Sequence, residues 1–92
     1  MALIVQKFGG SSVADVDRVR HVAGIITDTY KAGNDVVVVL SAQGKTTDKL
    51  LAMAEQYNPR ASKRELDQLL STGEQQSVAL CAMVIQSMGV PV

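Results

Sequence analysis

The 92-residue sequence has no tryptophan, a single phenylalanine and a single cysteine. The lone Cys81 excludes an internal disulfide, and no other metal-binding residue stands at ligand spacing around it. Because free cysteines are commonly buried, we expect Cys81 in the core. With so few aromatic residues and 47% apolar residues, the composition predicts one small soluble globular unit with an aliphatic core.

The sequence also has no excess of positive or negative residues, since its formal net charge is zero. No stretch is basic enough to follow a phosphate backbone, so we expect no nucleic acid partner. No apolar run reaches the roughly 20 residues of a membrane span. The first residues lack the charged lead and cleavage site of a secretion signal, so we expect a cytoplasmic protein that does not bind membranes.

Two runs rich in valine and isoleucine are present, "ALIVQKF" at 2–8 and "DVVVVLS" at 35–41. Neither alternates with polar residues, which is typical of parallel strands covered on both faces. Between them, apolar residues recur every three or four positions, which predicts an amphipathic helix capped by Ser12 and ended by Gly33. The order predicts a βαβ unit with a right-handed crossover.

The second half of the chain reads as helices. "DKLLAMAEQY" at 48–57 predicts one, ended by Asn58 and Pro59. A capping box at 62–65, "SKRE", predicts a short helix. The spacing of "STGE" at 71–74 predicts the start of a separate long helix, and "VPV" at the end resembles the first residues of a third strand.

Lys7 stands at the carboxyl end of the first strand, followed by Gly9 and Gly10. Ligands bind at this edge in open α/β sheets, and glycines followed by a helix N-terminus let backbone N–H groups approach an anion. The pattern predicts a phosphate site. The alternative is a plain turn from which Lys7 extends into solvent. Neither G-x-G-x-x-G nor a Walker loop is present, since Val39 stands where the latter needs glycine.

The loop after the second strand, "LSAQGKTTD", begins with Ser41, which lies beside the end of the first strand if the two strands are neighbours. Its other polar residues have structural interpretations. Thr46 or Thr47 can be an N-cap, and Lys45 a solvated lysine. Glu74 can complete the capping box at 71–74.

Three stretches together resemble a known family: "KFGGSSV" at 7–13, "VVVLSAQGKTTDKLL" at 37–51 and "LLSTGEQQSVALCAM" at 69–83. In order and spacing they are similar to the opening third of bacterial aspartokinases, members of the amino-acid kinase family. Gln43 departs from the pattern, since many relatives carry methionine there. The resemblance implies a three-layer αβα sandwich with a mainly parallel sheet, of which residues 1–92 form the N-terminal portion without a second domain.

The resemblance also implies an activity, transfer of the γ-phosphoryl group of MgATP to the side-chain carboxylate of L-aspartate. Lys7 is then the catalytic residue that contacts the transferring phosphate. The residues implied for the ATP phosphates are Lys7, Phe8, Gly9, Gly10, Ser11 and Ser41, and those for aspartate are Thr47 and Glu74. No metal ligand is implied within these residues.

The chain is much shorter than an amino-acid kinase domain, and the resemblance places the adenine pocket and the metal-coordinating acid outside it. We therefore expect this chain alone to be inactive. We also expect the parent enzyme to be a homo-oligomer. Two alternatives stay open: another amino-acid kinase with a different acceptor, and a non-catalytic module that binds anions or a partner chain.

Overall fold

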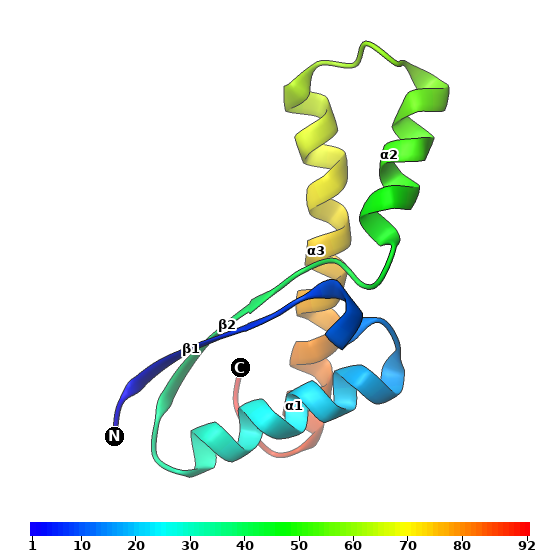
Figure 1. The fold of residues 1–92 in the computed structure, drawn as a ribbon. Helices are drawn as coiled ribbons and strands as arrows, with labels where there is room; N and C mark the ends of the chain where they lie inside the picture. Colours follow the sequence, from blue (N-terminus) through cyan, green and yellow to red (C-terminus); the bar gives the residue numbers. More distant parts are fainter.

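The computed structural model describes all 92 residues (Figure 1). The elements, in chain order, are β1 (Leu3–Phe8), the 3-10 helix η1 (Gly10–Val13), α1 (Val16–Lys31), β2 (Asp35–Leu40), α2 (Thr46–Tyr57) and α3 (Lys63–Ser87). None of the helices has both the length and the apolar character needed to cross a bilayer.

The two strands form a parallel pair, in register from Leu3 opposite Asp35 to Phe8 opposite Leu40. α1 carries the chain back between them, which confirms the predicted βαβ unit. The turn into β2 also matches the sequence. Gly33 adopts a positive φ of 100° after α1 ends, a conformation that glycine tolerates best.

The core lies between one face of the sheet and the two helices α1 and α3. Its buried residues are Val13, Val19, Val22, Ala23, Ile26, Cys81, Ile85 and Val90, with Phe8, Val36, Val38 and Leu40 packed against them from the sheet. Cys81 is buried as predicted, and desolvation raises the pKa of its thiol. The core is mostly aliphatic, and Phe8 is its one aromatic side chain.

The other face of the sheet is bare. Leu3 and Val5 of β1 are 69% and 63% exposed, and Val37 and Val39 of β2 are 48% and 45% exposed. The strand pattern was predicted to belong to a sheet covered on both faces, and these 92 residues cover one of those faces, because α1 and α3 both pack on the same side. The uncovered face is as apolar as the covered one.

The first helix begins later than predicted. Ser12 lies inside η1, and the N-cap of α1 is Asp15, whose side chain accepts a hydrogen bond from the backbone N–H of Arg18 at 2.9 Å. Both serine and aspartate are favoured N-caps. The sequence pattern alone did not distinguish them, because the extra 3-10 turn precedes the true start of α1.

α3 is one continuous helix, so the predicted break at "STGE" is wrong. Its start is as predicted, with Ser62 accepting from the N–H of Glu65 at 3.3 Å. The Ser71 hydroxyl donates to the Gln68 carbonyl at 2.7 Å, so Ser71 is a helix-interior residue and not a cap. Gly73 is buried, and a Cβ there would lie 3.1 Å from side-chain carbons of Ala42 and Thr46. Close packing explains this glycine.

Figure 1 shows α2 and the first half of α3 as an antiparallel hairpin that projects beyond the ends of the strands, while the second half of α3 passes beside α1. The last three residues, 90–92, form no strand, so the predicted third strand is absent here. Val90 instead turns back into the core after Gly89, whose φ is +84°.

Candidate phosphate-binding edge

Both strands end at the same edge, which we call the carboxyl edge. The N–H of Ser41, directly after β2, donates to the carbonyl of Phe8 at the end of β1 at 3.2 Å. Lys7 is exposed and pairs with Val39 in the sheet register. The structure therefore brings Lys7 and Ser41 to neighbouring positions, as the sequence predicted.

The loops that follow the two strands touch each other. The N–H of Gly44 donates to the carbonyl of Gly10 at 2.9 Å. A Cβ on Gly10 would lie 2.6 Å from the carbonyl oxygen of Ala42, which is too close for any side chain. Gly44 itself has a φ of +51°. Glycine at both positions is thus needed for the two loops to meet.

Gly9 is different from Gly10. Its backbone has ordinary extended angles, with φ −76° and ψ 173°. A Cβ at Gly9 would have no atom within 4 Å. Nothing in the packing of this chain therefore requires glycine at position 9.

Four successive carbonyl groups at this edge accept hydrogen bonds from protein donors. Their donors are the N–H groups of Ser41, Ser12 and Gly44 and the guanidinium of Arg18, which bind the carbonyls of Phe8, Gly9, Gly10 and Ser11 respectively. The N–H groups of Gly9, Gly10 and Ser11 take part in none of the hydrogen bonds of loops, turns and side chains. The first residues of a helix have no intrahelical acceptor either. The segment therefore has its acceptors occupied and its donors free, which suits an anion.

The start of α1 was predicted to add its positive end to this site. Its first turn binds its own cap, since the Asp15 carboxylate accepts from the N–H of Arg18. A carboxylate at a helix N-terminus also offsets the positive end of the helix dipole. The groups that the structure brings together at the predicted site are therefore Lys7 and the loop backbone, while the Asp15 carboxylate reduces what the start of α1 can add.

Of the two residues predicted to hold aspartate, Thr47 lies exposed in the first turn of α2. The N-cap of α2 is Lys45, without a side-chain hydrogen bond, so the alternative that Thr46 or Thr47 caps this helix is wrong. Lys45 is itself exposed. Thr47 remains without a structural role in the packing.

Glu74 lies exposed in the middle of α3. It lines a hollow of about 500 Å³ together with Val39 and Leu40 of β2, and with Ser71. The capping-box interpretation of Glu74 is wrong, because α3 begins eleven residues earlier at Lys63. The structure thus places this carboxylate beside the last residues of β2, next to the strand that carries Lys7.

A second hollow, of about 660 Å³, lies on the α1 side of the same loop. Its lining includes Phe8, Ser11, Ser12, Asp17, Arg18 and His21. Arg18 was missed by sequence reasoning. Its spacing from Asp15 was visible as an i, i+3 pair, but its contact with the Ser11 backbone has no sequence signal. No group of three or more His, Cys, Asp or Glu side chains is placed to hold a metal ion.

Comparison with known proteins gives a consistent result. Residues 2–92 match the model of the amino acid kinase family, and the chain belongs to that family. It is 61% identical over 89 residues to an aspartokinase of Mycolicibacterium smegmatis and 55% identical over 89 residues to one of Geobacillus stearothermophilus. These matches cover 97% of this chain but 21% and 22% of those proteins.

The structural comparison agrees with the sequence comparison. The crystal structure of aspartate kinase from Synechocystis superimposes with a TM-score of 0.91 and 52% identity, covering 94% of this chain and 15% of that one. The predicted resemblance to aspartokinases and the predicted α/β fold with a parallel sheet are confirmed. The chain spans about a fifth of the length of the curated relatives it matches.

Proposed function

We propose that these 92 residues are the N-terminal, phosphate-binding portion of an aspartokinase domain. The enzyme would transfer the γ-phosphoryl group of MgATP to the side-chain carboxylate of L-aspartate, the first step toward lysine, threonine and methionine. The observation that carries this proposal is the row of N–H groups from Gly9 to Ser11, which donate to no protein acceptor and directly follow the strand that ends with Lys7 and Phe8. The similarity to aspartokinases supports the choice of acceptor.

Each group at the carboxyl edge has a role in this proposal. Phosphoryl transfer needs mainly positioning and positive charge where negative charge gathers. The Lys7 amine stabilises the transferring phosphoryl group. The backbone of Phe8, Gly9 and Gly10, with Ser11 and Ser41, binds the ATP phosphates.

The aspartate substrate is assigned to the hairpin side of the edge. The Glu74 carboxylate binds the substrate ammonium group, and the Thr47 hydroxyl binds a substrate carboxylate. The hollow that Glu74 lines next to β2 supports this assignment. Testing aspartate against glutamate and N-acetylglutamate as acceptors of the full-length enzyme distinguishes an aspartokinase from other members of the family.

Mg²⁺ enters this proposal as part of the nucleotide substrate. The chain offers no cluster of carboxylates for it, so we assign no residue here to the metal. The 92 residues supply only part of the proposed active site, and an incomplete site cannot align the attacking carboxylate of aspartate with the γ-phosphate of ATP. We therefore propose that this chain alone is inactive, and that the parent enzyme is a cytoplasmic homo-oligomer. ADP release by the purified chain with ATP and aspartate would contradict the first point.

The main test is Lys7→Ala in a full-length aspartokinase carrying these residues. Loss of a charge that stabilises the transition state should lower kcat by about 10²-fold or more. The melting temperature should change little, because Lys7 is exposed. Lys31→Ala, at the far end of α1, is the matched control and should leave kcat unchanged. A near-normal kcat for Lys7→Ala would mean that Lys7 is only a solvated lysine.

A further inference from the structure

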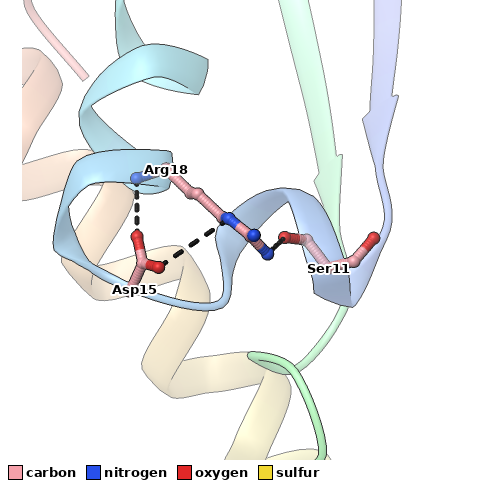
Figure 2. Close-up of polar contacts among 3 residues, drawn as sticks. All are labelled: Ser11, Asp15 and Arg18. Carbon is pink, nitrogen blue, oxygen red and sulfur yellow. Dashed lines mark hydrogen bonds and ion pairs between the residues drawn. The ribbon is translucent and has the colours of Figure 1, made fainter.

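Arg18 makes two contacts that join the start of α1 to the segment before it (Figure 2). Its guanidinium Nη1 donates to the carbonyl oxygen of Ser11 at 2.9 Å. Its Nε lies 3.7 Å from Oδ2 of Asp15. The other oxygen of Asp15, Oδ1, accepts from the backbone N–H of Arg18 at 2.9 Å. One carboxylate thus caps α1 and also orients the guanidinium.

The consequence concerns the peptide group between Ser11 and Ser12. Its carbonyl is held by Arg18, and its N–H donates to the carbonyl of Gly9 at 3.1 Å. Rotation of this peptide plane would break both hydrogen bonds. A rotated peptide could turn the negative end of its dipole toward a bound anion, which would weaken binding.

We propose that Arg18 is a positioning residue for ATP, which keeps the Ser11 carbonyl turned toward α1 so that the neighbouring N–H groups stay available to the phosphates. This inference rests on the proposed function of the same loop. Asp15 acts one step further away, by holding the guanidinium of Arg18. Neither side chain is assigned a contact with the substrate.

Because the Arg18–Asp15 pair is exposed, an effect of Arg18 on nucleotide binding can be distinguished from an effect on protein stability. The side chains of Arg18 and Asp15 are 58% and 60% exposed, and exposed ion pairs contribute little to folding. Removal of Arg18 should therefore leave the melting temperature almost unchanged. Its effect should appear in nucleotide affinity.

α1 contains a matched control. Arg20 and Asp17 form a second i, i+3 pair, with 4.0 Å between Nη1 and Oδ1 and with 66% and 97% side-chain exposure. Arg20 donates to no loop carbonyl. Arg20→Gln therefore removes the same charge from the same helix without releasing Ser11. Asp15→Asn is a second useful variant, because asparagine keeps the cap but loses the charge that orients Arg18.

The experiment uses a full-length aspartokinase carrying these residues, with ATP affinity measured by calorimetry and by steady-state kinetics. Arg18→Gln should raise the Kd and KM for ATP about threefold to tenfold, as expected for one lost hydrogen bond. The KM for aspartate and the melting temperature should not change. Asp15→Asn should give a smaller change in the same direction, and Arg20→Gln none. Amide exchange at Ser12 should become faster only in the Arg18 and Asp15 variants.

Equal ATP affinities for Arg18→Gln and Arg20→Gln would overturn the proposal, whatever the exchange rate at Ser12. Faster exchange at Ser12 with unchanged ATP affinity would leave Arg18 a purely structural contact. Failure of the proposed function is a separate result, because it shows in the unaltered enzyme as the absence of aspartate-dependent ADP release. Calorimetry with ATP still tests Arg18 in that case.

Discussion

Gly9 and Gly10 are adjacent glycines, yet the structure requires glycine at only one of these two positions. A Cβ on Gly10 would collide with the Ala42 carbonyl at 2.6 Å, whereas one on Gly9 would meet no atom of this chain. Gly10 is therefore explained by the fold. Under the proposed function, a phosphate that approaches the backbone closely would account for Gly9.

This difference gives a paired prediction in the full-length enzyme. Gly10→Ala forces the two loops apart, and should lower the free energy of unfolding by about 1–3 kcal/mol, the usual cost of overpacking. Gly9→Ala should leave the melting temperature within a degree or two but raise the KM for ATP. Thermal melting and steady-state kinetics measure both effects. If Gly9→Ala binds ATP normally, the phosphates do not lie against position 9.

Glu74 supplies a prediction about the acceptor. Because α3 runs unbroken through position 74, glutamine there keeps a good helix former and removes only the charge. If Glu74 binds the substrate ammonium group, Glu74→Gln should raise the KM for aspartate at least tenfold and leave the KM for ATP as it was. Steady-state kinetics with each substrate varied in turn provides the measurement. An unchanged KM for aspartate would remove Glu74 from the substrate site.

At the scale of elements, the reactivity of the Cys81 thiol measures how often α3 separates from α1 and the sheet. Its side chain is 2% exposed and burial raises its pKa, while only the thiolate reacts as a nucleophile. In the full-length enzyme we expect slow labelling by a thiol reagent at pH 8 and fast labelling in urea. Labelling at the unfolded rate without urea would show that α3 opens freely.

The raised pKa of Cys81 also predicts a pH dependence. Because the folded state favours the protonated thiol, the free energy of unfolding should fall as pH rises through the usual thiol pKa.

The elements that sequence reasoning predicted well are those with a strong local pattern. The two valine-rich strands and the helix between them follow from apolar spacing alone. The continuity of α3 did not, because Gly73 packs on Ala42 and Thr46, about thirty residues earlier in the chain. Serine and threonine in "STGE" favour caps in general, and this local preference was overridden by long-range packing.

The same distinction holds at the candidate site. Lys7 and Ser41 were predicted to end side by side, because parallel strands end at one edge of a sheet, and the strand register places both at that edge. The contact of Arg18 with Ser11 was not predictable, since a backbone carbonyl has no residue type to recognise. The η1 turn was missed for a related reason. Four residues are too few to show a helical period.

At the scale of the whole molecule, the uncovered face of the sheet determines whether the isolated chain is expected to associate. Leu3, Val5, Val37 and Val39 expose apolar surface there, and each of the two strands has an open edge. Such surfaces promote association. We expect the isolated 92-residue chain to self-associate or to fold poorly.

Sedimentation of the purified chain tests this expectation. Val5→Lys combined with Val37→Glu places opposite charges on paired positions and should shift the population toward monomers. Val16→Lys is the control, because Val16 is 62% exposed but lies on α1, away from that face. A well-behaved monomer with a cooperative melt in the unaltered chain would show that the bare face does not drive association.

The register of the two strands also determines how this unit can assemble. Leu3 pairs with Asp35 and Phe8 with Leu40, so every rung of the ladder joins residues that are 32 positions apart. Closing a loop of that length costs about 3 kcal/mol in chain entropy, and no rung offers a cheaper first contact. Once one rung has formed, the others add without a new closure. Pairing should therefore be all-or-none, and it should wait until α1 has shortened the path between the strands.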